Sequence, residues 1–496
     1  MRNIALTILF ATVCTTSIAQ SSRDPLVKRL GAAQSQFAQR LYSQVAGEKA
    51  SENLILAPYG VFESLSMLQL GSSGDTTDRI ARVTGIRPDQ VTLAAFKRAR
   101  QQAAPTSLRF GATVSDNDGY GVKLTDQPSD ELTALGISKG DLIFSVDGRP
   151  VRTAREFLDT CATSIGAVQI DGFSRERGVL FTRLTAPLER VRELNVEPHS
   201  QVVNFASALW LRDNLVEGSK FPSQLSKLFE TRTFPSTFRS AETITEQANE
   251  FFNSQTGGRI DKVDMPNQFS PNTAMILMNA MTMDAKWERQ FKTALTKPGT
   301  FAAPDGDTQT DYMRQQSIFA FASSRSVKVV ELPYRNTDLR MTVFLPIDPE
   351  GWKNIESAFF LDKLELHNLA RQMRPTRLDL KLPRFDLRMS GSLKASVQKL
   401  GLGSLFTSEA DFTGIDSRDR VMLDDMRQQV YVTTNEEGTR AGSVTKATGV
   451  LKSVPVKAEP FHAIHPFLFL IRDSYGIVYF AGRVTHPAPH PDTAAE

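Results

Sequence analysis

Apolar and polar residues follow two different patterns along this chain, and these patterns predict its main elements. Residues 24–46 and 59–85 predict helices, and in the second of them the apolar side chains recur at steps of three and four. Residues 200–211, 273–285 and 339–346 are apolar at most positions and predict long strands. Strands of that kind belong in a sheet that is covered on both faces. We therefore expect a fold of the α+β class.

The first twenty residues predict a secretory signal. Arg2 precedes a short apolar run, and a small-x-small triplet ends at Ala19. The run is too short to span a bilayer. The alternative is a buried N-terminal helix. Cleavage after Ala19 would leave Cys161 as the one cysteine, so no internal disulfide is expected, and we expect a secreted or periplasmic protein.

Residues 105–186 differ in texture from the rest of the chain. They contain short strands and tight turns, such as "KGDLIFSVDGRPV" and "GAVQIDGFSRERGVLFTRL". Helical patterns, each opened by a capping residue, follow Ser129 and Thr153. The segment is long enough to be a domain. The predicted organisation is a signal peptide at 1–19, a main domain at 20–104 and 187–487, an inserted domain at 105–186, and a flexible tail at 488–496.

Composition and charge narrow the function. The 496 residues are 41% apolar and 23% charged, which is typical of a globular protein. The net charge is +3 and no run of Lys and Arg is long, so we expect no nucleic-acid partner. The six histidines form no H-E-x-x-H pattern, and the chain has neither a G-x-S-x-G elbow nor a phosphate loop. We predict no metal, no cofactor and no enzymatic activity.

The inserted segment resembles a known family. Its stretch "ALGISKGDLIFSVDGRPV", residues 134–151, is similar to PDZ domains of the bacterial type, which also indicates a bacterial source. The resemblance implies that an extended C-terminal peptide of a partner protein adds as a strand beside the second helix. Carried over, the peptide-binding residues are Leu108, Arg109, Phe110, Gly111, Phe157 and Cys161. The spacing of the last two is equally what core packing would produce.

The chain on either side of the insert resembles serpins. The matching stretches stand in family order, from "ENLILAPYGVFESLSMLQLGSSGDT" and "MILMNAMTMDAKWERQF" through "KLGLGSLF" to "HPFLFLIRDSYGIVYFAGRVTHP". Together they cover all of the chain outside the signal and the insert. The resemblance implies a serpin fold, with mixed sheets, surrounding helices and an exposed reactive-centre loop, interrupted by a small PDZ-like domain rich in β-strands. It also implies that the chain acts as a monomer on a serine protease.

The stretch "NEEGTRAGSVTKATGVLKSVPV", residues 435–456, contains almost no large side chain. The resemblance implies that it is the reactive-centre loop, which a protease cuts and which then enters the main sheet as a new strand. From Thr439 to Leu451 every second residue is uncharged, and the three charged residues up to Lys452 fall on the other face. A strand with this pattern buries no charge. The predicted hinge and inserting residues are Glu437, Gly438, Thr439, Ala441, Ser443, Thr445 and Ala447.

The bond that the protease would cut lies thirteen residues beyond the hinge threonine in inhibitory members. This count places it between Lys452 and Ser453, and a lysine suits a trypsin-like pocket with an acidic floor. A bond after Leu451 would instead select a chymotrypsin-like protease. A third interpretation is that Lys452 is an ordinary solvated loop residue.

The region where the sheet must open departs from the family pattern. Asn279 and Trp287 match it, but Ala57 and Gly60 stand where serines are usual, and Gln428 stands where a histidine is expected. This thinning of a polar cluster leaves two functions open. The chain is either a secreted suicide inhibitor of trypsin-like serine proteases that recruits a partner through its PDZ-like module, or a non-inhibitory scaffold whose function is peptide binding by that module.

Overall fold

A computed structural model gives the arrangement of the chain as two compact units. One consists of Pro25–Thr106 and Glu193–Glu496, and the other contains Ser107–Arg192 together with Met1–Asp24. The structure describes residues 25–48, 51–87, 92–93, 95–96, 114–116, 121–125, 127–128, 130–151, 157, 169–184, 202–217, 219–335, 337–360, 369, 372–417, 421–439 and 458–488.

The helices of the larger unit confirm one predicted helix and divide the other. α1 spans Pro25–Glu48, whereas the predicted helix at 59–85 is two helices, α2 (Pro58–Gly71) and α3 (Gly74–Thr84). The chain breaks at Ser73, whose N–H donates to Asp411 O at 2.9 Å instead of continuing the helix. The other helical segments are α7 (Asp213–Val216), α8 (Phe221–Phe229), α9 (Ala241–Gln255), η2 (Thr293–Leu295), η3 (Pro349–Gly351), α10 (Trp352–Phe360), α12 (Lys394–Val397), η4 (Gln398–Leu402) and η5 (Gly403–Phe406).

No described helix of the chain is both long and apolar enough to cross a membrane. Gly401 has a φ of +96° inside η4. Residues with a side chain rarely adopt this left-handed backbone conformation, so the kink in the helix at this point favours glycine.

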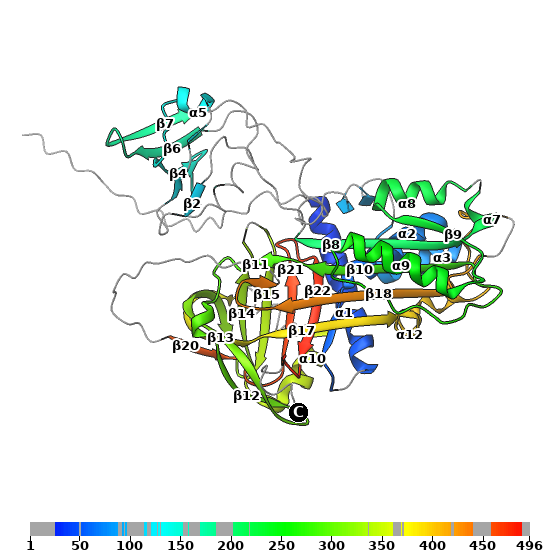
Figure 1. Cartoon of the computed structure of the whole chain (residues 1–496). Helices are drawn as coiled ribbons and strands as arrows, with labels where there is room; N and C mark the ends of the chain where they lie inside the picture. Colours follow the sequence, from blue (N-terminus) through cyan, green and yellow to red (C-terminus); the bar gives the residue numbers. More distant parts are fainter. Residues whose placement is uncertain are drawn as a thin grey trace, which may run out of the picture. The chain divides into compact units, whose positions relative to one another are not determined.

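The main sheet has the strand order β11-β19-β18-β10-β8-β9, and β17 pairs with the outer side of β18. Figure 1 shows β8, β10 and β18 as long neighbouring strands, with α9 lying across them. β10 is buried at all nine positions, and its side chains alternate between a cluster shared with α2 and a cluster shared with α9. The prediction of a sheet covered on both faces is therefore confirmed. The strands are β8 (Val203–Arg212), β9 (Arg232–Ser236), β10 (Met275–Met283), β11 (Ala285–Lys286), β17 (Phe385–Ser392), β18 (Asp425–Thr434) and β19 (Gly438–Thr439).

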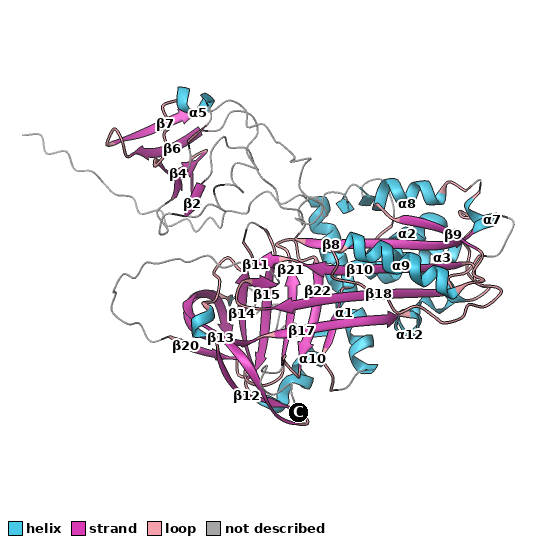
Figure 2. Cartoon of the chain, in the orientation of Figure 1, coloured by secondary structure: helices cyan, strands magenta, loops and turns pink. Residues whose placement is uncertain are grey.

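A second sheet completes the larger unit, and Figure 2 shows its strands running across the direction of the main sheet. Its order is β1-β22-β21-β15-β14-β13-β16-β20, with β12 paired to β13. The stretches "VVELPY" and "LRMTVFLP" form the antiparallel pair β14 and β15, and the closing stretch forms β21 and β22. The strands are β1 (Leu54–Leu56), β12 (Lys297–Ala303), β13 (Gly306–Ser323), β14 (Val327–Pro333), β15 (Arg340–Pro346), β16 (Arg374–Pro383), β20 (Glu459–His462), β21 (Phe467–Arg472) and β22 (Val478–Val484).

The smaller unit has a sheet and a core of its own. Its strand order is β2-β3-β4-β6-β7, with β5 paired to β4, and the helix predicted after Ser129 is α5 (Asp130–Ala134). Asp147 and Gly148 both have positive φ at the turn between β4 and β5, as a tight hairpin requires. Among the described residues, ten buried side chains from Val122 to Phe181 form its core. The strands are β2 (Val114–Asp116), β3 (Val122–Leu124), β4 (Leu142–Val146), β5 (Arg149–Pro150), β6 (Gln169–Ser174) and β7 (Val179–Leu184).

Candidate functional site

The described part of the chain contains six of the residues that the sequence predicts for the hinge and the sheet-opening region. All six lie in or beside the main sheet, at Asn279, Trp287, Gln428, Glu437, Gly438 and Thr439. Phe157 is described in the smaller unit. The other predicted site residues lie outside the described residues, namely Leu108, Arg109, Phe110, Gly111, Cys161, Ala441, Ser443, Thr445, Ala447, Lys452 and Ser453.

Gln428 is the centre of a buried polar cluster between β10, β18 and the start of α2. Its Nε2 donates to Ala57 O and to Asn279 Oδ1, both at 2.8 Å, and its Oε1 accepts from Ala57 N at 3.0 Å. Asn279 Nδ2 in turn donates to Ser64 Oγ at 3.2 Å. Asn279, Gln428, Ala57 and Ser64 are all fully buried. The amide of Gln428 therefore ties β18 to both β10 and α2.

The close fit of α2 explains the small residue at position 60. A Cβ on Gly60 would lie 2.5 Å from Asn279 Oδ1 and 3.1 Å from Asn279 Cγ. A serine could not occupy this place without displacing Asn279. The polar cluster therefore persists without the usual serines and histidine, because the long Gln428 side chain reaches the backbone of Ala57 directly.

Replacing Gln428 with alanine is expected to destabilise the protein by about 3 kcal/mol or more. The change removes three hydrogen bonds and leaves the buried N–H of Ala57 without a partner, which costs about 1–3 kcal/mol, while the C=O of Ala57 keeps only the bond from Gly60 N. Urea denaturation measures the effect. The matched control is Gln429→Ala, since Gln429 is partly exposed and bonds only at the surface. Equal stability of Q428A and Q429A would contradict the role of this cluster.

Thr439, which the sequence predicts as a hinge residue, lies within the main sheet. β19 lies between β11 and β18, with Thr439 paired antiparallel to both Ala285 and Thr434. Its side chain is fully buried, and its Oγ1 lies 2.7 Å from the hydroxyl of Tyr334. A Cβ on the preceding Gly438 would lie only 1.9 Å from Ala285 O, so this close approach requires glycine.

The turn before β19 is held by Asn435 and by the indole of Trp287. Asn435 Oδ1 accepts from the N–H groups of Glu437 (3.1 Å) and Gly438 (3.2 Å). Trp287 Nε1 donates to Asn435 O at 2.9 Å, and Trp287 N donates to Glu437 O at 2.8 Å. The indole also stacks on Tyr334, with 4.5 Å between ring centroids. The predicted residue Trp287 thus fixes where the loop leaves β18.

An ion pair at this turn could not be identified from the sequence pattern. Arg384, between β16 and β17, donates to Glu436 Oε1 at 2.7 Å and to Asp311 Oδ2 at 3.0 Å, and Thr296 Oγ1 donates to Glu436 as well. Burial tends to raise the pKa of the Glu436 carboxyl, but the hydrogen bonds from Arg384 and Thr296 outweigh it and hold the pKa below its usual value. Only the acidic pair in "NEEG" hints at this role, and the partner lies fifty-two residues away.

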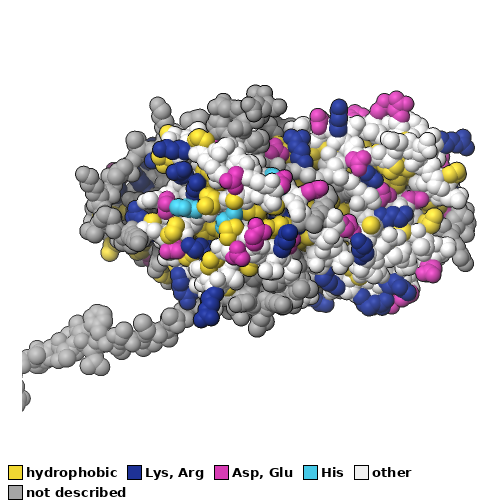
Figure 3. All heavy atoms as spheres, turned by 90° about the horizontal axis from the view of Figure 1, so that it is seen from below, with side chains coloured by type: hydrophobic (Ala, Val, Ile, Leu, Met, Phe, Trp, Pro, Cys, Tyr) yellow, Lys and Arg dark blue, Asp and Glu magenta, His cyan; other side chains and the backbone are white. Residues whose placement is uncertain are grey.

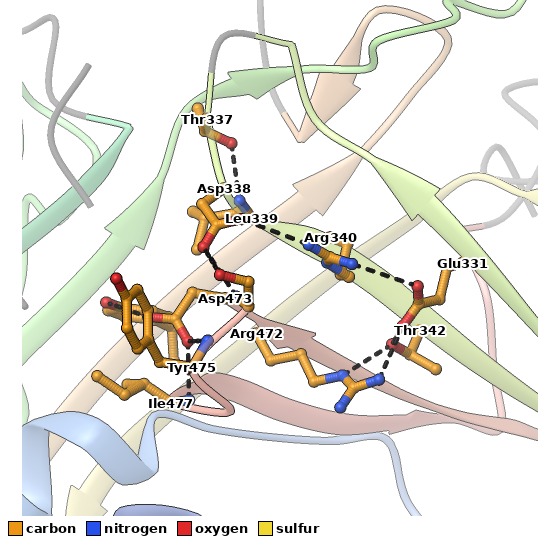
Figure 4. Close-up of polar contacts among 12 residues, drawn as sticks. Glu331, Thr337, Asp338, Leu339, Arg340, Thr342, Arg472, Asp473, Tyr475 and Ile477 are labelled. Carbon is orange, nitrogen blue, oxygen red and sulfur yellow. Dashed lines mark hydrogen bonds and ion pairs between the residues drawn. The ribbon is translucent and has the colours of Figure 1, made fainter. Parts of the chain in front are cut away.

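A buried aspartate, Asp473, contacts a tyrosine that packs against the start of α2. Asp473, at the end of β21, accepts hydrogen bonds at Oδ1 from Tyr475 N and Ile477 N, both at 2.9 Å (Figure 4). Its Oδ2 is 3.5 Å from the hydroxyl of Tyr479. The Tyr479 ring packs against Tyr59 of α2, with 5.2 Å between centroids. Asp473 therefore contacts Tyr479, against which Tyr59 of α2 packs.

The environment of Asp473 is unfavourable for its charge. Burial raises the pKa of Asp473 from its usual value near 3.8 to about 7, and the negative charge of Asp338 adds to the shift. Asp338 is itself bonded by Ser474 N at 2.9 Å and by Arg340 at 3.3 Å. Figure 4 shows Arg340 continuing this network to Glu331, away from Asp473.

This shift predicts a pH dependence of stability. Native Asp473 holds its proton more tightly than the unfolded chain does, so the free energy of unfolding falls as pH rises from about 4 to about 7 and is lowest above that range. Asp473→Asn keeps the oxygen that accepts both N–H groups but cannot ionise. We expect it to be more stable than the natural chain at pH 8, by up to about 4 kcal/mol, and to lose this slope.

Urea denaturation between pH 4.5 and 8 checks the prediction. Asp307→Asn serves as the control because Asp307 is exposed. Parallel pH profiles for D473N and the natural chain would show that another group carries the slope.

Among the described residues, no group of three or more His, Cys, Asp or Glu side chains is placed to hold a metal ion. The candidate site consists instead of a buried polar cluster between two parallel strands and of the short strand β19 beside them.

Comparison with known proteins identifies a family for most of the chain. The family model described as "Serpin (serine protease inhibitor)" matches residues 32–123 and 179–487. Serpin B3 of Homo sapiens is 30% identical over 301 residues, covering 60% of this chain and 77% of that protein. The leukocyte elastase inhibitor of Sus scrofa is 31% identical over 257 residues, covering 50% and 68%. Relatives of this kind are inhibitors and not enzymes.

Solved structures show the same fold. Human thyroxine-binding globulin superposes with a TM-score of 0.66 at 17% identity, covering 93% of this chain and all of that one. Uncleaved ovalbumin gives a TM-score of 0.65 at 20% identity, covering 92% of this chain and all of that one. The family model covers well over half of the residues, in the stretches 32–123 and 179–487, and this chain therefore belongs to the serpin family of serine protease inhibitors.

Proposed function

We propose that the chain is a suicide inhibitor of trypsin-like serine proteases. The protease cuts the loop after Lys452, and the loop then enters the main sheet between β10 and β18 while the protease is still attached as an acyl-enzyme. The observation that supports the proposal is the position of Thr439, which lies between β11 and β18. From the end of β10 onward, β10 and β18 pair directly with each other in parallel. We call this line of pairing the seam.

The register of the hinge supports insertion along this seam. Continuing the antiparallel pairing of Thr439 by six residues places Thr445 opposite Gln428 on β18 and opposite Asn279 on β10. Asn279 and Gln428 are already paired with each other across the seam. The two extrapolated registers agree, which supports insertion with the Thr445 hydroxyl in the cluster that now joins the two amides.

Insertion would also improve the pairing of the sheet. The loop turns back after β18, so the entering strand runs antiparallel to β10 and to β18. It would replace one parallel ladder, from Ile276 to Thr282, with two antiparallel ladders, which are slightly more stable per residue. The uncharged side chains at every second position from Thr439 fit the face that packs against α2. Insertion pulls the acyl-enzyme away, and a distorted oxyanion hole cannot complete hydrolysis.

Trypsin provides the test of this function. The purified chain should form an adduct with trypsin that survives SDS, and Lys452→Ala should abolish it because the acidic pocket floor selects a basic residue. Lys446→Ala is the matched control, since it removes another loop lysine without touching the proposed bond. Cleavage of the loop with no adduct, in the natural chain and in K446A alike, would refute inhibition.

We propose peptide binding by the smaller unit as a second function. Its own sheet and core, and the resemblance of residues 134–151 to PDZ domains, support a module that binds the C-terminal peptide of a partner. Phe157 is fully buried in that core, which favours the core-packing interpretation of this residue over a groove position. Titration of the full chain with peptides that end in a free carboxylate tests the function, and equal binding of the amidated peptides would refute it.

We also propose that the chain is exported and acts outside the cytoplasm. The support is the sequence before Gln20, which lies outside the described residues. Sequencing the N-terminus of the protein recovered from the periplasm and from the medium of expressing cells tests this. A mature chain that still begins at Met1 would refute it.

A further inference from the structure

A row of basic side chains crosses three neighbouring strands of the second sheet. Arg314 on β13 pairs with Lys381 on β16, and Lys381 pairs in turn with His462 on β20. The residues before and after Lys381 are fully buried leucines, so the row lies on the opposite, outer face. At this level the sheet therefore presents three nitrogen-bearing side chains side by side.

Two further levels of the same face extend the row. Gln316 pairs with Asp379, and Ile318 pairs with Arg377. Asp379 Oδ2 lies 2.9 Å from His462 Nε2, so this carboxylate is used within the sheet. Arg377 is exposed, and Ile318 is 55% exposed, which is high for a large apolar side chain. The face thus combines cationic groups with one apolar contact point.

The pairing of Arg314 with Lys381 works against folding. Like charges directly opposite each other on neighbouring strands destabilise a sheet. Burial, and then the charge of Arg314, lower the pKa of Lys381. Lys381 Nζ lies 4.0 Å above the ring of Tyr312, and Arg314 Nε is buried without a hydrogen-bond partner. Among the described residues neither cation has a carboxylate within ion-pair distance. Because the repulsion between Arg314 and Lys381 destabilises the free protein, this face is suited to binding an anionic partner.

The row lies close to the proposed bond along the chain. β20 begins at Glu459, six residues after Ser453, and six residues span at most about 20 Å. A protease domain is wider than this, so an enzyme bound at Lys452 extends over the neighbouring sheet. Figure 3 shows both Lys and Arg (dark blue) and Asp and Glu (magenta) side chains near the histidines on the face of the molecule seen from below.

We propose that Arg314, Lys381, Arg377 and Ile318 form a docking surface for an acidic patch on the target protease. The surface rests on the proposed function, because the protease is brought to it by the bond at Lys452. Complementary charge at the edge of an interface mainly speeds association and makes it sensitive to salt. The surface would therefore select, among proteases with the same pocket, those that carry negative charge beside the active site.

Anionic and cationic trypsin provide the test because their pockets have the same specificity and their surfaces have opposite charge. The association rate constant of the natural chain should be higher for anionic trypsin and should fall steeply as salt rises. The double variant Arg314→Gln, Lys381→Gln should associate about 10-fold more slowly with anionic trypsin at low salt and no more slowly with cationic trypsin. The control is Arg325→Gln, which removes an exposed charge beyond the end of β13.

Two more measurements separate this surface from the inhibitory function. The melting temperature of the double variant should change little, because the relief of repulsion offsets the loss of the contact between Lys381 and the Tyr312 ring. Affinity for catalytically inactive anionic trypsin should weaken about 10-fold, and this binding needs neither cleavage nor insertion. Weakened binding without any adduct in the natural chain would support the surface and refute inhibition. Equal rates of adduct formation in all variants would refute the docking surface. It would also be refuted if the double variant were retained less on a heparin column but bound anionic trypsin as well as the natural chain does.

Discussion

Cleavage after Lys452 is expected to raise the melting temperature of the chain by about 10 °C or more. For a domain of this size such a rise corresponds to roughly 5 kcal/mol or more of added stability. The physical reason is the seam between β10 and β18, whose seven register pairs, from Ile276–Asp425 to Thr282–Tyr431, form one parallel ladder. An entering strand would replace this ladder with two antiparallel ones and bury its small side chains.

Differential scanning calorimetry of the intact chain and of the chain nicked by a catalytic amount of trypsin measures the change. The variant K452A, taken through the same digestion, is the control for cuts elsewhere. A nick normally lowers stability, since it gives the unfolded chain more freedom. A nicked chain that melts at or below the temperature of the intact chain would therefore refute insertion.

The prediction of the fold from the sequence succeeded where a pattern is local. The apolar run that forms β10 specifies a strand covered on both faces, and the structure has such a strand. The helix predicted at 59–85 was wrong in its continuity because its apolar period persists across the break. Ser73 leaves the helix to bond Asp411, and a contact across more than three hundred residues has no local pattern.

The candidate site divides in the same way. Asn279, Gln428 and Thr439 could be named from stretches that resemble a family, and the structure brings them to one seam. The contacts of Gln428 with Ala57 could not be predicted, because they depend on how closely α2 approaches the sheet. Arg384 was missed altogether, since a single arginine between two strands carries no pattern that pairs it with Glu436.

Strand register decides the last prediction, which contrasts two adjacent residues of the loop. Continued from Thr439, the register places Thr445 between Asn279 and Gln428, which are fully buried beneath α2. Thr445→Arg would bring a charge without a partner into this position, at a cost of several kcal/mol. We expect trypsin to cut this variant after Lys452 without forming an SDS-resistant adduct, so at least about 10-fold more inhibitor is consumed per trypsin molecule.

Val444→Arg carries the same charge on the opposite face of the entering strand. There the entering residue would lie between Gln429 of β18, which is partly exposed, and the small, buried Ala280 of β10, and a long arginine side chain can extend past them to water, as Lys446 on this face must also do. We expect V444R to keep its adduct with trypsin and its gain in melting temperature after cleavage, and T445R to lose both. Gel electrophoresis at several ratios of inhibitor to trypsin, followed by calorimetry of the cut chains, compares the two. If both variants inhibit, or if only V444R fails, the strand does not enter in the register that Thr439 establishes.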